Sequence, residues 1–600
     1  MTVVRVWAPR AGKVELVLGD ERLPMGQVES APGRGGWWEL ETDAAVPGAD
    51  YAFCIDGGPP RPDPRSRHQP HGVHEAGRLV DPSRFRWTDG GWTGRTPAGA
   101  VVYELHVGTF TPEGTFDAAL ARLDHLAQLG IDVVELMPVA AFPGEHGWGY
   151  DGVALWAVHE PYGGPEGLAR FVDACHARGI SVLLDVVYNH LGPSGNYLAE
   201  FGPYFTDKHH TPWGWAVNLD DAGSDEVRAF IVDNAQSWLR DYHLDGLRLD
   251  AVHALADTRA LHVLEQLSTA VDDLSVRLGR NLTLIAETDL NDPRIVTPRT
   301  HGGHGVHAQW NDDFHHALHS LLTGERQAYY ADFGEIAAVV KTLTGAYFHD
   351  GTWSSFRGRT HGRAIDTGLL GGDRFVAFLQ DHDQIGNRAQ GDRITGSLSA
   401  GRARIGAALL LTSPFTPMLF MGEEWGASTP WQYFTDHPDQ DLGAAIREGR
   451  QGEFARHGWS AQQVPDPQAP ETFERSKLDW DEIANADHGA LLAWYRRLIA
   501  LRHSDPDLSD PRLTEVRADF DESAAWLVVR RGAVRVAVNL AAHEQPVPLD
   551  AQVAELILTS AAPVDEARII ASLGAHSPDL PTAAVTVRLP AESVAILRTA

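Results

Sequence analysis

The sequence has few cysteines and fewer basic than acidic residues. Its 600 residues include two cysteines, Cys54 and Cys175, which excludes a disulfide framework and fits a reducing compartment such as the cytoplasm. The sequence has 50 lysines and arginines against 81 aspartates and glutamates, which gives a net charge of −31. Nucleic acids and anionic membranes are therefore not expected partners. The acidity suits an enzyme acting on a neutral substrate, and it suits solubility alone equally well.

Long hydrophobic runs are also missing. The most apolar stretch, residues 405–421, is interrupted by Ser413, Pro414 and Pro417. A membrane-spanning helix needs about 20 mainly apolar residues, so this stretch predicts a buried helix followed by a strand. The first 20 residues alternate like a strand and lack the apolar centre of a signal peptide. We expect a cytoplasmic protein.

Three regions differ in the period of their hydrophobic residues. Short alternating runs in residues 1–90 predict an N-terminal β-sandwich. In residues 91–504, strands alternate with helices, which predicts a (β/α)8 barrel with long loops. Alternating runs return in residues 505–600 and predict a C-terminal β-domain. The expected class is thus an α/β barrel flanked by two β-domains.

Eight barrel strands can be assigned from this pattern, with a helix expected at 115–129 after the first of them. The strands are expected at residues 101–107, 133–139, 181–188, 245–253, 282–287, 306–310, 374–380 and 417–420.

The fourth of these strands delivers charge where it ends, in the stretch Asp245-Gly-Leu-Arg-Leu-Asp-Ala-Val-His253. Arg248 and Asp250 are two residues apart, so their side chains face the same way. In a barrel of this class, the carboxyl ends of the strands surround the active site. A cation beside a carboxylate keeps it ionised, as a nucleophile requires. The same two residues are also typical of a structural ion pair, and alone they do not distinguish a catalytic aspartate from a structural one.

Similar polar clusters follow three other strands, at residues 185–190, 286–288 and 380–387. Together the four clusters offer five carboxylates and two imidazoles at the expected barrel mouth. Two neighbouring carboxyl groups, one ionised and one protonated, are what glycoside cleavage needs.

These clusters resemble the four sequence regions of the α-amylase superfamily, which contains retaining α-glucosidases and transglycosylases. Asp185, Asn189-His190, Gly246…Arg248…Asp250, Glu287 and His382-Asp383 match them in order and spacing across the whole barrel. The resemblance implies that Asp250 is the nucleophile, Glu287 the general acid/base, and Asp383 the carboxylate that binds the distorted sugar. It further implies that the sugar at the cleavage point is bound by Arg248, His190, His382 and a stacking Tyr150.

Within the superfamily, three segments resemble the maltooligosyltrehalose trehalohydrolases, which cut the α-1,4 bond next to a terminal trehalose. They are residues 145–152, residues 204–215, and residues 381–388. Branching enzymes usually have serine at the position of Asp381, and much of the superfamily has asparagine. The resemblance implies maltooligosyltrehalose or a related α-glucan as substrate, and no cofactor.

A bent pocket for the trehalose end would need aromatic and hydrogen-bonding side chains around the mouth. Candidates are Trp213 and Trp215, His253, and Phe356 with Arg357 in the loop between strands six and seven. The alternative is that these aromatic residues only pack the loops together.

No metal is expected at the site. Asn189 is interpreted as a hydrogen-bonding brace of its loop rather than a metal ligand. Six histidines have metal-like spacing, but neither a thiolate nor a His-Glu-x-x-His pattern accompanies them, so loop and helix-surface positions are expected. They are His301, His304, His307, His315, His316 and His319.

Two other functions compete with a trehalose-releasing hydrolase. A transglycosylase such as a branching enzyme uses the same covalent intermediate but resolves it with a sugar hydroxyl instead of water. A non-catalytic carbohydrate-binding protein on an amylase-like barrel is expected to lose catalytic carboxylates, whereas this chain keeps all three.

Overall fold

The protein is described by a computed structural model, which covers residues 2–28, 35–96, 99–455, 463–573 and 585–600. Eight parallel strands form a closed barrel in its centre, in the order β12-β15-β16-β17-β20-β21-β8-β9. They are β8 (Val102–Leu105), β9 (Val133–Leu136), β12 (Ser181–Val186), β15 (Gly246–Leu249), β16 (Thr283–Ala286), β17 (Ala308–Trp310), β20 (Phe375–Phe378) and β21 (Thr416–Phe420). Each of the eight expected ranges contains or overlaps one of them, so the predicted barrel is confirmed.

Helices cover the outside of the barrel. Among the longer ones are α4 (Gly164–His176), α6 (Ser224–Asp241), α7 (Val263–Leu278), α8 (Asp312–Thr323), α11 (Ala400–Leu411) and α14 (Ala486–Ser504). The helix expected at 115–129 is instead two short helices, α2 (Phe116–Leu120) and α3 (Leu123–Leu129). Its ends are as predicted, because the Thr115 hydroxyl caps α2 and Gly130, at φ 94°, ends α3.

Two hydrophobic cores result from the alternation along the strands. Leu247 and Leu249 of β15 point outward and pack under the helices, whereas Val102, Ile285 and Phe378 belong to a separate apolar layer of the strands. Residues 405–421 contain the buried second half of helix α11 and the buried strand β21, in the expected order of helix and strand. Among the described helices, none combines the length and the apolar character needed to cross a bilayer.

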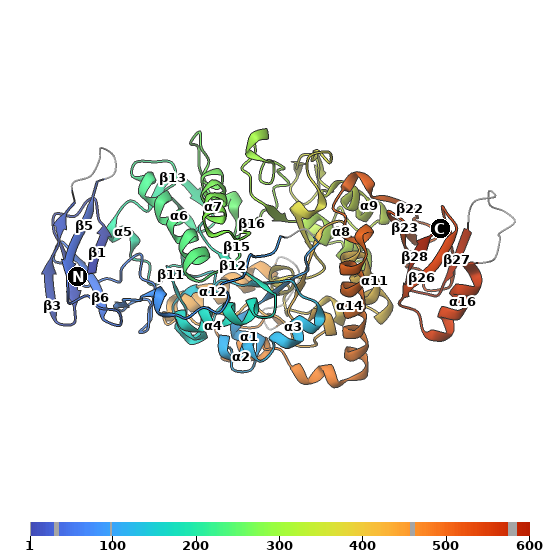
Figure 1. Ribbon diagram of the computed structural model, residues 1–600, viewed down its shortest axis with the longest axis horizontal. Helices are drawn as coiled ribbons and strands as arrows, with labels where there is room; N and C mark the ends of the chain where they lie inside the picture. Colours follow the sequence, from blue (N-terminus) through green and yellow to red (C-terminus); the bar gives the residue numbers. More distant parts are fainter. Residues whose placement is uncertain (1, 29–34, 97–98, 456–462, 574–584) are drawn as a thin grey trace.

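Two β-rich regions flank the barrel at opposite ends of the long axis (Figure 1). The N-terminal region holds the antiparallel sheets β1-β5-β4 and β3-β2-β6-β7. Their strands are β1 (Thr2–Trp7), β2 (Val14–Leu18), β3 (Glu21–Pro24), β4 (Gly26–Gln27), β5 (Trp37–Thr42), β6 (Asp50–Ile55) and β7 (Gly77–Arg78). The C-terminal region holds a five-stranded sheet in the order β22-β23-β24-β28-β26 and the pair β25-β27. These strands are β22 (Arg517–Asp521), β23 (Trp526–Arg531), β24 (Val534–Asn539), β25 (Gln545–Leu549), β26 (Val553–Thr559), β27 (Val585–Leu589) and β28 (Ser593–Thr599). The boundaries expected at residues 90 and 504 stay predictions.

Candidate active site

Arg248 lies at the centre of the charged groups inside the barrel mouth. Its fully buried guanidinium donates from Nη1 to Asp185 Oδ2 and to Asp250 Oδ1, both at 2.9 Å. Nη2 lies 3.9 Å from Glu287 Oε2, and the guanidinium carbon lies 4.2 Å from the centroid of the Trp310 ring. One cation therefore contacts three carboxyl groups from three adjacent strands. Its expected role as a direct sugar ligand stays a prediction.

Asp250 is held by hydrogen bonds on both carboxylate oxygens. Arg248 binds Oδ1, and Asn189 Nδ2 donates to Oδ2 at 2.7 Å and to the Asp250 main-chain carbonyl at 2.8 Å. The Asp250 side chain is still 12% exposed and lines a cavity. Asn189 thus braces the expected nucleophile. Within the described residues, no cluster of three or more His, Cys, Asp or Glu side chains has a metal-binding arrangement.

Glu287 follows β16 and is positioned by the backbone just beyond the end of the neighbouring strand β15. The Ala251 N–H donates to Glu287 Oε2 at 2.6 Å from a left-handed conformation, at φ 40°. Burial raises the pKa of Glu287 to about 8, with Asp250 and Asp383 adding to the rise and Arg248 opposing it. At neutral pH this carboxyl group therefore holds a proton, which a general acid must supply.

His382 begins α10 (His382–Gly386) directly after β20, and Asp381 Oδ1 caps this helix by accepting from Gln384 N. The His382 ring nitrogen Nδ1 pairs with Glu104 Oε1, and the His382 main-chain N–H donates to Glu104 Oε2 at 3.1 Å. Nε2 lies 3.5 Å from Asp383 Oδ2. Burial lowers the pKa of His382, but the Glu104 carboxylate, with Asp383 and Asp381, outweighs burial and raises it to about 10.

Tyr150 joins the two sets of charges. Its hydroxyl accepts from the protonated Nε2 of His382 at 2.8 Å and donates to Asp185 Oδ2 at 2.6 Å. Asp185 also accepts from Arg248, so a continuous hydrogen-bonded chain runs from Glu104 to Arg248 under the barrel mouth. Burial raises the pKa of Asp185 to about 7 against the opposing effect of Arg248.

A cavity of about 360 Å³ opens above these groups. Seven of the predicted site residues line it: Tyr150, His190, Trp213, Asp250, His253, Glu287 and Asp383. Arg248 and His382 lie buried directly against them.

Trp213 and Trp215 lie in and beyond the turn of the hairpin β13 (Phe205–Thr211) and β14 (Gly214–Val217). The Trp213 ring stacks on His190 with 4.2 Å between centroids and 1° between planes, and it remains 49% exposed. Trp215 is 62% exposed and does not line the cavity.

Phe356 and Arg357 also lie outside the cavity lining, in the turn between β18 (Thr352–Ser354) and β19 (Arg359–His361). Arg357 Nη2 bonds to Asp289 Oδ2 at 2.5 Å, two residues beyond Glu287, so this turn is tied to the barrel rim. The Phe356 ring is 53% exposed.

Several lining residues were missed in the sequence. Tyr433 and Thr435 follow β21 in a long loop, and Arg450 belongs to α12 (Gln440–Ala455), so no strand end marks them. Glu104, which lies beneath the cavity, could have been singled out from the sequence, because it is an acidic residue inside the apolar strand β8. The expectation that His315 and His319 lie on a helix surface was wrong: both are buried in α8, where their rings pack against Phe378 and Tyr330.

Comparisons with known proteins agree with this geometry. A family model described as alpha amylase, catalytic domain, matches residues 79–220, and carbohydrate-binding module 48 (isoamylase N-terminal domain) matches residues 1–66. A domain of unknown function matches residues 511–596.

Among curated proteins, the chain is similar to the malto-oligosyltrehalose trehalohydrolase of Arthrobacter ramosus, at 58% identity over 89% of this chain and 92% of that one. It is 54% identical to the Mycobacterium tuberculosis protein of the same name, over 94% and 96%. Among solved structures, a putative alpha amylase from Salmonella typhimurium superposes with a TM-score of 0.87 at 38% identity, covering 100% of this chain and 97% of that one.

Proposed function

The chain belongs to the malto-oligosyltrehalose trehalohydrolase family of the α-amylase superfamily, and from this we propose that it hydrolyses the α-1,4 bond next to the terminal trehalose of maltooligosyltrehalose, releasing trehalose. The identity of 58% over 89% of the chain supports the substrate. The observation that carries the chemistry is the pair of carboxyl groups beside Arg248: Asp250, hydrogen-bonded to a cation, and Glu287, protonated at neutral pH.

In the proposed mechanism, Asp250 attacks the anomeric carbon and forms a glycosyl ester, while Glu287 gives its proton to the glycosidic oxygen of the departing trehalose. A water molecule then loses a proton to Glu287 and attacks the same carbon, which releases the glucan and restores Asp250. Two displacements at one carbon retain its α configuration. Since Asp250 and Glu287 follow adjacent strands and share Arg248, they fit the short separation of a retaining enzyme, about 5–5.5 Å.

The other site residues are proposed to hold the sugar at the cleavage point. Asp383, 44% exposed at its side chain, is free to accept from sugar hydroxyls. The Tyr150 ring and His190 line the cavity and are proposed to contact the same sugar, and the cationic His382 fixes the Tyr150 hydroxyl. Arg248 completes this set by binding Asp250.

For the trehalose end we propose Trp213 and His253, which line the cavity, together with Trp215, Phe356 and Arg357, which lie outside its lining. Aromatic rings offer sugars a large apolar surface with little entropy to lose, and a guanidinium donates paired hydrogen bonds to neighbouring hydroxyls. The exposure of Trp213, Trp215 and Phe356 leaves their rings available for this contact.

We also propose that the enzyme works in the cytoplasm without a nucleic-acid partner. Cys54 and Cys175 are both buried and unpaired, as a reducing compartment permits. The net charge of −31 repels a polyanion.

Product analysis tests this function. The purified protein is incubated with maltooligosyltrehalose and, separately, with amylose, and Asp250→Asn serves as the inactive control. We expect free trehalose and a shortened maltooligosaccharide from the first substrate and much slower change in the second. Branched or lengthened glucans in place of trehalose would instead identify a transglycosylase, which the 29% identity to a branching enzyme of Xanthomonas oryzae makes the rival.

A further inference from the structure

Arg450 reaches the catalytic cavity from α12, a helix that lies beyond the last barrel strand in the sequence. It lines the cavity together with Asp383 of α10 and with Asn387, the residue that caps the end of α10. The guanidinium carbon lies 5.1 Å from the centroid of the Tyr433 ring and 4.8 Å from that of Phe454. Aromatic rings attract cations within about 6 Å of their centroids. The two rings therefore help to hold the guanidinium at the cavity wall.

Two acceptors at the end of α10 bind this guanidinium. Arg450 Nη1 donates to the side-chain oxygen Oδ1 of Asn387 at 3.0 Å, and Nη2 donates to the main-chain carbonyl of Gly386. A guanidinium has five N–H donors and no acceptor, so the oxygen of the Asn387 amide has to face it, and not the nitrogen. The NH2 group of the same amide then points away from Arg450. The guanidinium thus determines which way round the Asn387 amide sits.

The NH2 group of Asn387 faces the carboxylate that is proposed to bind the sugar. Asn387 Nδ2 donates to Asp383 Oδ1 at 3.3 Å, while the cationic His382 has its Nε2 3.5 Å from Asp383 Oδ2. Each carboxylate oxygen therefore has a neighbouring nitrogen that attracts it, and the two nitrogens together favour one orientation of the carboxylate. An amide turned the other way would bring its oxygen against Asp383, and two acceptors form no hydrogen bond.

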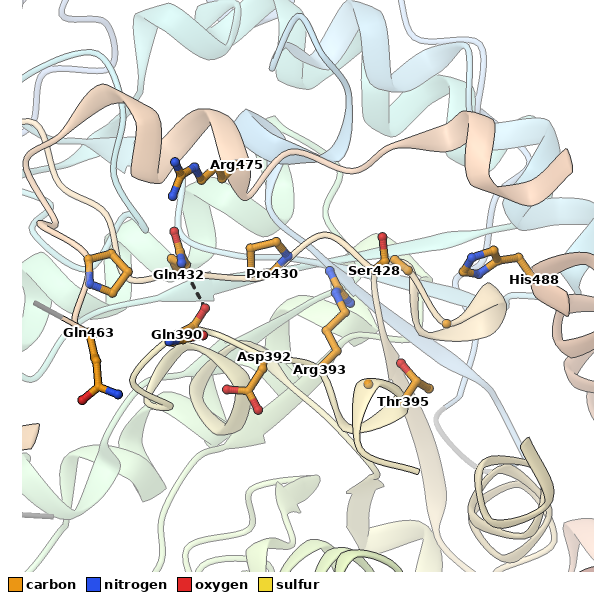
Figure 2. A pocket seen from close by; sticks show the side chains of 14 residues that line it. Gln390, Asp392, Arg393, Thr395, Ser428, Pro430, Gln432, Gln463, Arg475 and His488 are labelled. Carbon is orange, nitrogen blue, oxygen red and sulfur yellow. Dashed lines mark hydrogen bonds between the residues drawn. The ribbon is translucent and has the colours of Figure 1, made fainter. Parts of the chain in front are cut away.

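Other bonds hold the chain beyond α10 in place. The Gly391 carbonyl accepts from the main-chain N–H of Trp431 at 2.8 Å. Gln432 Nε2 donates to the Gln390 carbonyl at 3.0 Å, and Figure 2 shows this bond between the two segments. Neither bond involves Arg450. The backbone should therefore keep its position when the guanidinium is removed, and the side chains that it contacts should become free to turn.

We propose that Arg450 is a positioning residue of the hydrolysis: it orients the Asn387 amide, and the amide orients the carboxylate of Asp383 toward the sugar at the cleavage point. This role rests on the proposed function, in which Asp383 binds the hydroxyls of that sugar. The sugar is distorted most in the transition state, so a misoriented Asp383 should slow bond breaking more than it weakens substrate binding. Arg450 itself needs no contact with the sugar.

A double-mutant cycle between Arg450→Met and Asn387→Ala tests this role, with maltooligosyltrehalose as substrate. Asn387→Ala should lower kcat about ten- to one-hundred-fold, the effect of losing one hydrogen bond to a charged group. Arg450→Met should lower kcat about tenfold, because the amide remains but is no longer oriented. In the Asn387→Ala background, Arg450→Met should have no further effect. KM should change little throughout.

Arg447→Met is the matched control. Arg447 lies on the same helix, pairs with Asp466 at 2.9 Å and lies outside the cavity lining, so its loss should leave kcat unchanged. Losses that multiply in the double variant, or a rise in KM at constant kcat, would overturn the positioning role and indicate that Arg450 binds the substrate directly. An unchanged kcat in Arg450→Met would overturn it as well.

Crystal structures of the parent and of Arg450→Met follow the same contact without any reaction. The contact between Asn387 and Asp383 should be present in the parent and lost in the variant, and its survival in the variant would contradict the role of Arg450. Circular dichroism verifies that each variant folds, and Asn387 is exposed, so alanine at this position leaves no buried cavity. A parent that releases no trehalose would refute the proposed function and leave the crystallographic comparison unaffected.

Discussion

Replacing Glu104 with glutamine tests whether the hydrogen-bonded chain under the barrel mouth needs its negative charge. Glu104 of β8 and Glu135 of β9 are paired across neighbouring strands, and both are 1% exposed. Glu104 pairs with His382, whereas Glu135 Oε2 has no partner within the described residues. Burial, with the neighbouring Glu104 carboxylate, raises the pKa of Glu135 well above its usual range. Glu135→Gln makes the same exchange on the neighbouring strand and leaves the Glu104–His382 pair in place, so it is a matched control.

Glu104→Gln removes the counter-charge of a buried imidazolium, a change that costs about 3–5 kcal/mol. Because the glutamine oxygen still accepts from His382, we expect the lower end, about 3 kcal/mol, which is roughly 100-fold in kcat/KM if all of it is felt in the transition state. The pKa of His382 should fall from its value of about 10. Activity of the variant should then recover as the pH is lowered and His382 regains its proton.

The free energy of unfolding should depend on pH for the same reason, the charge of His382. The pKa of His382 is raised in the folded protein, so the ion pair stabilises it fully below the unfolded value of 6.5, and the stabilisation is lost as pH rises through about 10. The difference in unfolding free energy between parent and Glu104→Gln should therefore shrink from pH 6 to pH 10. Denaturant unfolding and kcat/KM are measured over this range for both variants. Equal losses in Glu104→Gln and Glu135→Gln, or no loss in either, would refute the reasoning.

Four further predictions concern the reaction itself. Asp250→Asn and Glu287→Gln should each lower kcat by several orders of magnitude without unfolding the protein, because each removes a group that acts during bond breaking. Circular dichroism checks the fold, and activity within tenfold of the parent would exclude that residue from the mechanism. NMR of the products should detect the glucan first as the α-anomer, and initial β-anomer would contradict a nucleophilic Asp250. Activity should fall as pH rises through about 8, where Glu287 loses its proton, and a pH–rate profile flat to pH 10 would argue against Glu287 as the acid. Phe356→Ala combined with Arg357→Ala should lower the preference for trehalose-ended substrates by about ten- to two-hundred-fold, a loss of ~1–3 kcal/mol in discrimination; equal weakening on plain maltooligosaccharides would show that selectivity lies elsewhere.

The barrel could be predicted because its signals are local. Each strand is a short apolar run, and Asp250, Glu287 and Asp383 stand one to five residues beyond the ends of β15, β16 and β20. Parallel strands in a barrel bring these ends together whatever the loops between them do. The catalytic cavity therefore contains all three carboxylates that the sequence singled out.

The remainder depends on contacts between distant parts of the chain. Glu104 meets His382 across 278 positions, and no spacing rule links two such residues. Trp213 and Trp215 look equivalent in the sequence, but only Trp213 lines the cavity. The burial of His315 likewise follows from its packing against Phe378 in β20, which its own helix does not reveal.

The closing pair of the barrel also constrains how the chain can fold while it is being synthesised. Val102 of β8 pairs with Met418 of β21, so the first barrel strand cannot complete its pairing until the last one has been synthesised. At about 5–20 residues per second, the intervening chain takes roughly 15–60 s to emerge from the ribosome. During that time one edge of β8 has unpaired N–H and C=O groups, which favour association with other chains. Nascent protein should therefore depend most on chaperones until Phe420 has emerged and β21 can cover that edge.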